Sequence, residues 1–192
     1  MRIVFLTPDI KKKLNGVGLE KIFLNTFLNA DFLVIEEEMK RIIGIASVGG
    51  LFNIGGIFVS PSFRGTGLST KLNNFREQEM KNRKYSFFIG TTYSDNPHAK
   101  KILELLKNRN ARSVFSFSFS DGFVTTLYIQ EFNLKGKLFG MSLNLFNSKI
   151  GTFCLASALK FLNRFWDKLF LADSSNYKKI SVLYSVKNFK KV

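Results

Sequence analysis

Two glycines spaced two residues apart, Gly65 and Gly67, stand where an apolar stretch changes into a helical pattern. The apolar stretch, residues 54–59, predicts a strand, and a helical periodicity starts at Leu68. A strand that turns sharply into a helix leaves backbone N–H groups unpaired, and the helix dipole adds partial positive charge at that point. A turn of this kind binds phosphate groups well.

The residues around these glycines resemble the acyl-CoA loop of the GNAT superfamily of N-acyltransferases. In that family a strand ending in Val-x-Pro is followed by Arg-Gly-x-Gly-x-Gly/Ala and a helix. Serine stands here at the last position of the motif, where Gly or Ala is usual. The resemblance implies that the loop amides bind the pyrophosphate of an acyl-CoA, most simply acetyl-CoA. The alternative is an ordinary glycine-containing turn that binds nothing. The matching residues are Val59, Pro61, Arg64, Gly65, Gly67 and Ser69.

The resemblance also implies which residues contact this co-substrate. In the GNAT fold two parallel strands splay apart, and the pantetheine arm lies between them. We expect residues 54–59 to be one of these strands, with its backbone binding the pantetheine amides and stabilising the oxyanion that develops on the thioester. Lys71, Lys100 and Lys101 are further candidates for the 3′-phosphate of the nucleotide. The expected contacts are Ile57, Phe58, Val59, Arg64, Gly65, Thr66, Gly67, Leu68, Ser69, Thr70 and Asn96.

A second resemblance concerns catalysis. Residues 96–99, Asn-Pro-His-Ala, with Leu103 resemble the Asn-x-x-Ala-x-x-x-Tyr helix of the family. The family's tyrosine, which often protonates the leaving thiolate, falls at Leu103, and a carboxylate that often precedes the asparagine falls at Thr91. We therefore expect Tyr93 to act as general acid and Asp95 as general base through water. Asn96 has a helix-capping role as its alternative.

Other titratable residues give weaker signals. Glu36 to Glu38, beside a predicted hairpin, could gather an incoming amine. The chain has one histidine, His98, and one cysteine, Cys154, which argues against a zinc site and excludes an internal disulfide. Cys154 lies in an apolar helical run, so we expect it to be packed. We find no signal peptide and no apolar run long enough to span a bilayer, and we expect a cytoplasmic protein.

Strand and helix patterns alternate through residues 1–130 and predict an α+β fold. The resemblance implies a mixed, mostly antiparallel central sheet with a V-shaped splay between two parallel strands and helices on both faces. In the helix after the glycine loop, we expect Leu68, Leu72 and Phe75 to share one face. The predicted strands are residues 1–6, 31–37, 41–48, 52–59, 85–93, 114–120 and 123–129, and the predicted helices are 9–28 (interrupted near Gly16 and Gly18), 67–81 and one starting at 96.

Residues 131–192 are predicted to form a basic helical extension outside the domain of residues 1–130. Their 11 Lys/Arg and 3 Asp/Glu carry +8 of the chain's net charge of +15. Apolar residues paired every four positions from Ile150 to Phe170 predict an amphipathic helix. We expect this helix to pack on its own domain, with a homodimer interface or an anionic membrane surface as alternatives. Nucleic-acid binding is a further, less favoured reading of the charge.

Together these patterns predict an acyl-CoA-dependent N-acetyltransferase that needs no metal. A primary amine of unknown class would attack the thioester directly in a ternary complex. The alternative is a weak or inactive coenzyme A-binding module whose basic tail binds an acidic partner, because the usual acid and base are absent. A third reading is an enzyme acting on tRNA, the ribosome or a chromatin protein, whose affinity would fall steeply with salt.

Overall fold

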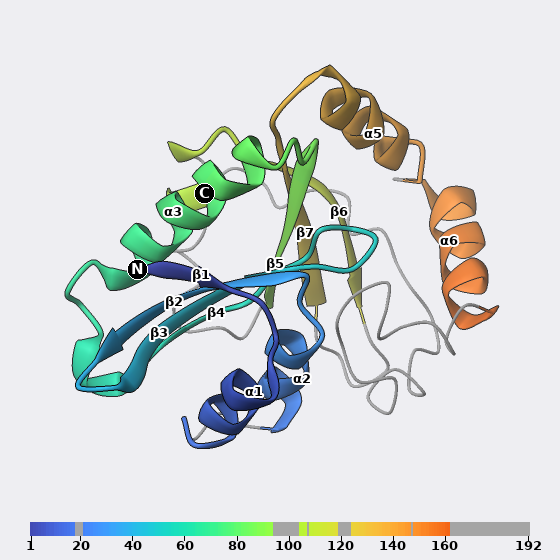
Figure 1. Ribbon diagram of the computed structural model, residues 1–192. Helices are drawn as coiled ribbons and strands as arrows, with labels where there is room; N and C mark the ends of the chain where they lie inside the picture. The colour runs from blue at the N-terminus through green and yellow to red at the C-terminus, as the bar shows by residue number, and fades with distance from the viewer. Residues whose placement is uncertain (18–20, 94–103, 107, 119–123, 147, 162–192) are drawn as a thin grey trace. The chain divides into compact units, whose positions relative to one another are not determined.

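The computed structural model describes residues 1–17, 21–93, 104–106, 108–118, 124–146 and 148–161 (Figure 1). The described residues belong to two compact units, residues 1–85 and 86–161. Each unit contains its own antiparallel sheet. The α+β class predicted from the sequence is therefore confirmed.

The sheet of the first unit has four antiparallel strands, and its second and third strands form a hairpin. Met39 and Lys40 turn this hairpin with φ angles of 47° and 66°. Two consecutive positive φ angles define the two-residue turn whose twist matches the flanking strands, so the predicted hairpin is confirmed. In spatial order the strands are β1 (Arg2–Val4), β2 (Phe32–Glu38), β3 (Arg41–Val48) and β4 (Ile57–Val59).

β4 is shorter than the predicted strand of residues 52–59. The chain turns back on itself after β3, with Gly50 and Asn53 at φ angles of 70° and 49°. Gly49 and Ile54 exchange backbone hydrogen bonds of 3.0 and 2.9 Å in an isolated bridge, and regular pairing resumes only at Ile57. Glycine pairs on both sides of this turn lower the strand propensity, which explains why an apolar stretch is not a continuous strand.

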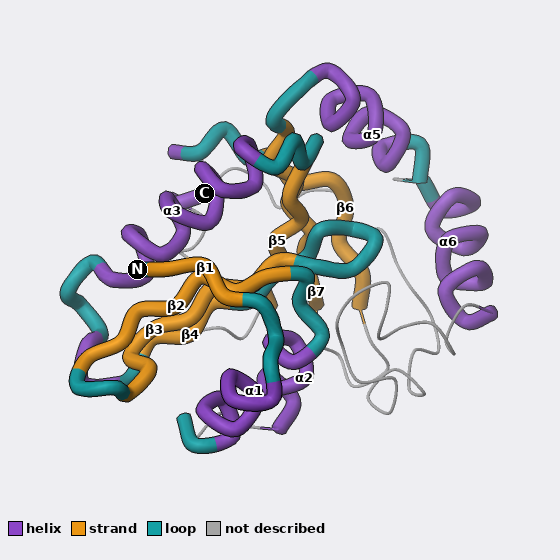
Figure 2. Tube along the Cα trace, in the orientation of Figure 1, coloured by secondary structure: helices purple, strands orange, loops and turns teal. Residues whose placement is uncertain are grey.

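Helices cover both faces of the first sheet, as Figures 1 and 2 show. α1 (Pro8–Asn15) and α2 (Lys21–Leu28) lie on one side, separated at the predicted break near Gly16. α3 (Leu68–Asn82) lies on the other side and contacts β2, β3 and β4. Side chains alternate along the strands, so Leu33 faces the α1–α2 side within one apolar core cluster, which also contains Ile10, Leu14, Phe27, Ile35 and Ile45.

α3 buries one residue every four positions, but not the set that we expected. Leu68 and Leu72 are buried, whereas Phe75 is 38% exposed. Arg76 takes the buried position instead, and its guanidinium donates to the carbonyl oxygens of Ser47 and Gly56 at 3.1 and 3.3 Å. One carbonyl group near the end of β3 and one just before β4 thus receive a buried donor.

The second unit has three antiparallel strands with β7 in the centre. Its last two strands along the chain, both predicted, pair antiparallel, although an irregularity between Ser113 and Phe115 interrupts the register. Ser116 is buried, and its hydroxyl lies 2.8 Å from the hydroxyl of Thr126 on the neighbouring strand. In spatial order the strands are β5 (Phe87–Tyr93), β7 (Val124–Glu131) and β6 (Arg112–Ser118).

Two helices follow this sheet, and the first of them was not predicted. α5 (Leu134–Asn144) packs on β6 and β7, and its Phe139 ring stacks on Phe87 at the start of β5 with centroids 4.2 Å apart. A Cβ atom on Gly136 would lie 1.9 Å from the carbonyl oxygen of Ser86, so only glycine permits this close approach. The packed side of this helix contains two glycines and one leucine, and the signal that could have found the helix is the spacing of Leu134, Leu138 and Met141 on its other side.

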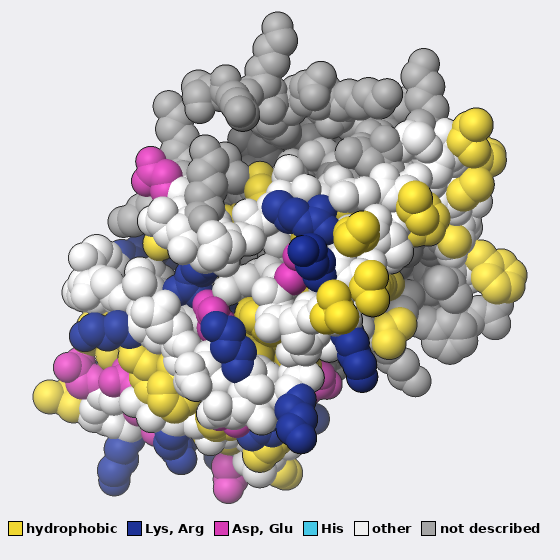
Figure 3. All heavy atoms as spheres, turned by 90° about the horizontal axis from the view of Figure 1, so that it is seen from above, with side chains coloured by type: hydrophobic (Ala, Val, Ile, Leu, Met, Phe, Trp, Pro, Cys, Tyr) yellow, Lys and Arg dark blue, Asp and Glu magenta, His cyan; other side chains and the backbone are white. Residues whose placement is uncertain are grey.

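α6 (Lys149–Phe161) matches the first part of the helix predicted over residues 150–170, and the remainder of that prediction lies outside the described residues. Cys154 on α6 is exposed, not packed as expected, because it lies on the same side of the helix as the exposed Ile150, Phe153 and Phe161. Among the described residues, no helix is long and apolar enough to cross a membrane. Figure 3 shows apolar side chains gathered over α5 and α6. The domain boundary at residue 130 stays a prediction.

Candidate functional site

The glycine loop joins β4 to α3 through a single turn of 3-10 helix, η1 (Pro61–Phe63). Gly65 and Gly67 adopt φ angles of 83° and 80°, a backbone conformation that residues other than glycine rarely adopt. A Cβ atom at either position would meet nothing within 4 Å. The glycines are therefore required by the backbone conformation, and the space in front of them is open.

The loop is held in shape by its own hydrogen bonds. The Phe63 N–H donates to the carbonyl of Ser60 at 2.9 Å, and the Arg64 N–H donates to that of Pro61 at 3.2 Å. The Thr66 hydroxyl donates to the carbonyl of Phe63 at 2.8 Å. A loop organised in this way does not have to be ordered when a ligand arrives, which lowers the entropy lost on binding.

The N-terminus of α3 differs from the N-termini of α1 and α5. The Thr7 hydroxyl caps α1 by accepting from the Ile10 N–H, and the Asn133 side chain caps α5 by accepting from the Gly136 N–H. Gly67 occupies the capping position of α3 and offers no side chain. In the described part of the chain, the first-turn N–H groups of residues 68–70 therefore have no side-chain acceptor, and they remain available to an anion.

The charges around this end of α3 favour an anion as well. The first turn of α3 contains no acidic residue, so nothing on the helix itself neutralises the positive end of its dipole. Arg64 and Lys71 are both exposed on either side of the glycines. The geometry and the charge together are favourable for phosphate, as the sequence predicts, and phosphate binding by these residues stays a prediction.

β4 directs only part of its backbone away from the sheet. The Ser60 N–H donates to the carbonyl oxygen of Ile43 at 2.9 Å. In the alternating antiparallel pattern, the backbone N–H and C=O groups of residues 60, 58 and 56 therefore point toward β3. The main-chain groups of Ile57 and Val59 consequently point away from β3. Of the three strand residues named from the sequence, Phe58 has its backbone in the ladder and its side chain against the core.

The proposed acid and base are only partly described. Tyr93 is the last residue of β5 and pairs with Thr125 on β7, but its side chain lies outside the described part. Asp95 and Asn96 lie outside the described residues, as do His98 and Leu103. Thr91 is exposed while Thr92 is buried, which agrees with Thr91 and Tyr93 sharing one face of the strand. The catalytic roles of Tyr93 and Asp95 stay predictions.

Two of the three glutamates expected near an incoming amine already have internal partners. Glu36 pairs with the N-terminal ammonium group. Glu37 accepts from Lys13 at 2.8 Å and from Arg2 at 2.7 Å. The hydrogen bond from Lys13, followed by the contribution of Arg2, holds the pKa of Glu37 below its ordinary value. Only Glu38 remains exposed, at the hairpin turn.

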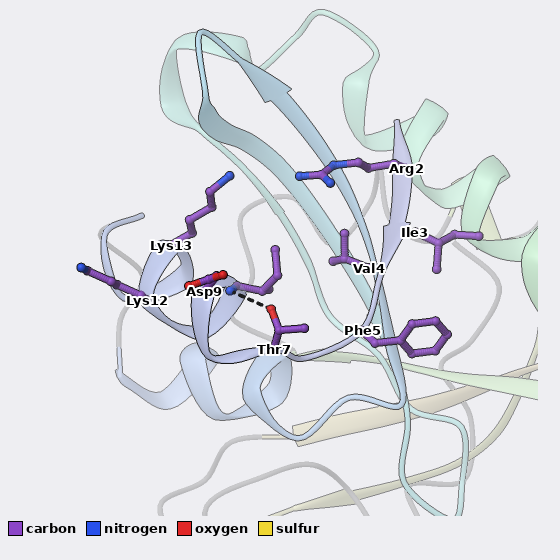
Figure 4. Close-up of a pocket in the computed structure, with 9 residues that line it drawn as sticks. Arg2, Ile3, Val4, Phe5, Thr7, Asp9, Lys12 and Lys13 are labelled. Atoms are coloured by element: carbon purple, nitrogen blue, oxygen red, sulfur yellow. Dashed lines mark hydrogen bonds between the residues drawn. The ribbon is translucent and has the colours of Figure 1, made fainter.

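A surface hollow lies between β1 and α1 (Figure 4). Its volume is about 840 Å³, and two of its cations, Arg2 and Lys13, are engaged by Glu37. Because β1 and β4 are the opposite ends of the first sheet, this hollow is separate from the glycine loop. The described residues contain no group of three His, Cys, Asp or Glu side chains that could hold a metal ion.

Comparison with protein families gives a match that spans the loop. The model of the acetyltransferase (GNAT) family matches residues 11–107, about half of the chain. The chain belongs to the GNAT acetyltransferase family. The matched part contains β4, the glycine loop and all of α3, so the resemblance seen in a short motif extends over the elements that position it. No curated protein sequence matches the chain.

Solved structures show the same GNAT fold. The ribosomal-protein-S18-alanine N-acetyltransferase from Escherichia coli is similar with a TM-score of 0.54 and 13% identity, over 69% of this chain and 94% of that one. A structure of yncA from Salmonella typhimurium with its cofactor acetyl-CoA has a TM-score of 0.51 and 15% identity, over 69% and 94%. An aminoglycoside 6′-N-acetyltransferase complexed with coenzyme A has a TM-score of 0.50 and 13% identity, over 68% and 97%.

Proposed function

We propose that this GNAT protein transfers an acyl group, most simply acetyl, from acyl-CoA to a primary amine. The observation that carries the proposal is the uncapped N-terminus of α3 behind an open glycine loop. Membership of the acetyltransferase family supports the transfer, and two structural neighbours that hold acetyl-CoA or coenzyme A support the co-substrate. The single cysteine of the chain fits a reducing, cytoplasmic compartment.

The loop supplies the binding energy for the diphosphate of the co-substrate. The amides of residues 65–70 donate to its oxygens, and the positive end of the α3 dipole acts in the same direction. Arg64 and Lys71 add charge from solvent-exposed positions. Thr66 serves mainly to hold the loop, because its hydroxyl already donates to Phe63.

β4 supplies the chemistry at the thioester. A main-chain N–H of Ile57 or Val59, directed away from β3, donates to the thioester carbonyl and stabilises the oxyanion that forms when the neutral amine attacks. A fixed donor of this kind contributes roughly 3–4 kcal/mol to the transition state. Phe58 is excluded from this role, since its N–H faces β3. Tyr93 and Asp95 are the proposed acid and base, and the coenzyme A thiolate is itself a good leaving group.

Release of free thiol from acetyl-CoA, measured with a panel of amines, tests this function. The wild-type protein is expected to release thiol with at least one class of primary amine. Val59→Pro and Ile57→Pro each remove one outward N–H and leave the hydrogen bonds to β3 intact. One of the two variants is expected to lose about 10²–10³-fold in kcat while keeping its affinity for acetyl-CoA and its melting temperature.

A protein that binds acetyl-CoA but releases no thiol with any amine would contradict the transferase assignment. That result would favour a module that only binds the co-substrate. Equal turnover by the wild type and both proline variants would contradict the role given to the β4 backbone.

A further inference from the structure

α5 presents an apolar face directly opposite the side that packs on the sheet. At 100° per residue, Gly136, Gly140 and Leu143 lie on the packed side, and all three are buried. The residues on the opposite side are all apolar, and each is more than half exposed. They are Leu134, Leu138, Met141 and Leu145.

α6 continues this pattern. Ile150, Phe153 and Phe161 are at least 71% exposed, and their spacing places them on one side of the helix. Cys154 and Ala158 are exposed between them on the same side. We call these outward residues of the two helices the α5–α6 apolar face. It contains seven of the thirteen large exposed apolar side chains found among the described residues, and a concentration of this kind is typical of interaction surfaces.

The charged side chains that α5 itself carries beside its apolar residues are both positive. Lys135 and Lys137 are exposed and flank the apolar residues of α5 on its two sides. The sequence between Glu131 and Asp167 contains five Lys/Arg and no Asp or Glu. Figure 3 shows blue side chains beside the yellow ones over this part of the molecule. An apolar face edged by lysine is typical of helices that lie in the surface of an anionic membrane.

We propose that the α5–α6 apolar face docks on an anionic lipid bilayer as a peripheral contact. α5 has 11 residues and the described part of α6 has 13, and no described helix is long and apolar enough to cross a membrane, so we place both helices along the interface. The apolar side chains enter the boundary between headgroups and acyl chains, and the lysines meet lipid phosphates. A second copy of the chain fits less well, because it would bring the same lysines together without a counter-charge.

Vesicle flotation tests the proposal with the full-length protein. One set of vesicles contains phosphatidylcholine alone, and the other contains phosphatidylcholine and phosphatidylglycerol in equal amounts. The wild type is expected to float with the anionic vesicles and not with the neutral ones. Lys135→Gln together with Lys137→Gln should weaken binding by roughly 25-fold, since each lysine near an anionic surface contributes about fivefold.

A matched pair of variants separates the apolar face from general surface charge. Leu138→Glu with Leu145→Glu places two carboxylates on the face and should abolish flotation. Met39→Glu with Leu51→Glu makes the same chemical change at two exposed apolar positions of the first unit and should float like the wild type. All four positions are exposed, so both proteins should keep the wild-type melting temperature.

Cys154 provides a direct readout of insertion, because it is the one thiol of the chain and is exposed on α6. An environment-sensitive fluorophore attached there should shift to shorter wavelength with the anionic vesicles only. Absence of wild-type flotation, or equal flotation of the Leu138→Glu/Leu145→Glu protein, would overturn the proposal. A concentration-dependent dimer without vesicle binding, broken by the same variant, would also overturn it in favour of a second copy.

Discussion

α3 and α5 differ in the side chains that they bury and in the side chains that they expose. α3 buries large side chains, with Leu72 fully buried, and turns polar residues and one partly exposed phenylalanine outward. α5 buries two glycines and Leu143 and turns four large apolar residues outward. α3 begins with a glycine that leaves its first-turn amides open, whereas α5 begins with an asparagine that accepts from one of them.

The difference shows where each helix meets its surroundings. α3 is built to face water along its length and to receive an anion at its N-terminus. The N-terminus of α5 is capped by a side chain, and its exposed side carries apolar residues that are suited to a contact with something other than water. The two helices thus offer different parts to a binding partner: α3 offers its N-terminus and α5 offers its lateral face.

The largest expected effect concerns the open end of α3. Gly67→Glu should weaken acetyl-CoA binding by roughly 100-fold or more, because two like charges about 4 Å apart near a protein surface repel by on the order of 4 kcal/mol. Titration calorimetry measures this affinity. Gly16→Glu adds the same charge at an exposed glycine with a φ angle of −85° and should bind normally. Undiminished affinity in a folded Gly67→Glu protein would remove the loop from the site.

The buried faces should respond differently from the outward ones. Leu72→Ala on α3 should lower the free energy of unfolding by about 3 kcal/mol, since it opens a cavity in the core. Leu138→Ala on α5 should change it by less than about 0.5 kcal/mol in water, because that side chain contacts little protein. Urea denaturation of both variants measures the contrast, and equal losses would mean that the apolar side of α5 is covered.

The packed side of α5 depends on glycine. Gly136→Ala should destabilise the protein by about 2–3 kcal/mol, because its Cβ would lie 1.9 Å from the Ser86 carbonyl oxygen. Gly16→Ala is the control, since the nearest atom to its Cβ is 3.4 Å away and its φ angle is negative. That change should be neutral or slightly stabilising in the same denaturation experiment. Matching stabilities for the two alanine variants would show that α5 does not pack as closely as described.

The smallest expected effect concerns the capped N-terminus of α5. Asn133→Ala removes the acceptor for the Gly136 N–H and should lower the free energy of unfolding by about 1 kcal/mol. It should leave acetyl-CoA affinity unchanged, whereas Gly67→Ala in α3 should alter that affinity through its positive φ angle. Loss of co-substrate binding in Asn133→Ala would contradict the separation of roles between the two helix ends.

Much of the fold follows from local sequence signals. The break between α1 and α2 near Gly16, the β2–β3 hairpin and the start of α3 were all predicted, because each depends on neighbouring residues. α5 was missed, although Leu134, Leu138 and Met141 recur at helical spacing, because its packed side contains only two glycines and one leucine. The length of β4 was overestimated, since residues 52–56 are apolar or small but form a turn stabilised by its own hydrogen bonds.

In the candidate site too, features that depend on neighbouring residues were predicted, and features that depend on contacts between distant residues were not. Gly65 and Gly67 were predicted to shape the loop, and their positive φ angles confirm that a local conformation selects them. Which β4 residues face outward could not be predicted, because that depends on the register with β3, a strand reached through a turn. The buried position of Arg76 was also missed, since its carbonyl partners come together only in the folded sheet.

The most direct test of the central claim observes the loop amides themselves. In the proton–nitrogen correlation spectrum, addition of coenzyme A should shift the signals of residues 65–70 and leave the α5 amides at residues 134–137 in place. The account predicts that these loop shifts saturate together and vanish in Gly67→Glu. Unshifted loop signals at saturating coenzyme A would contradict it.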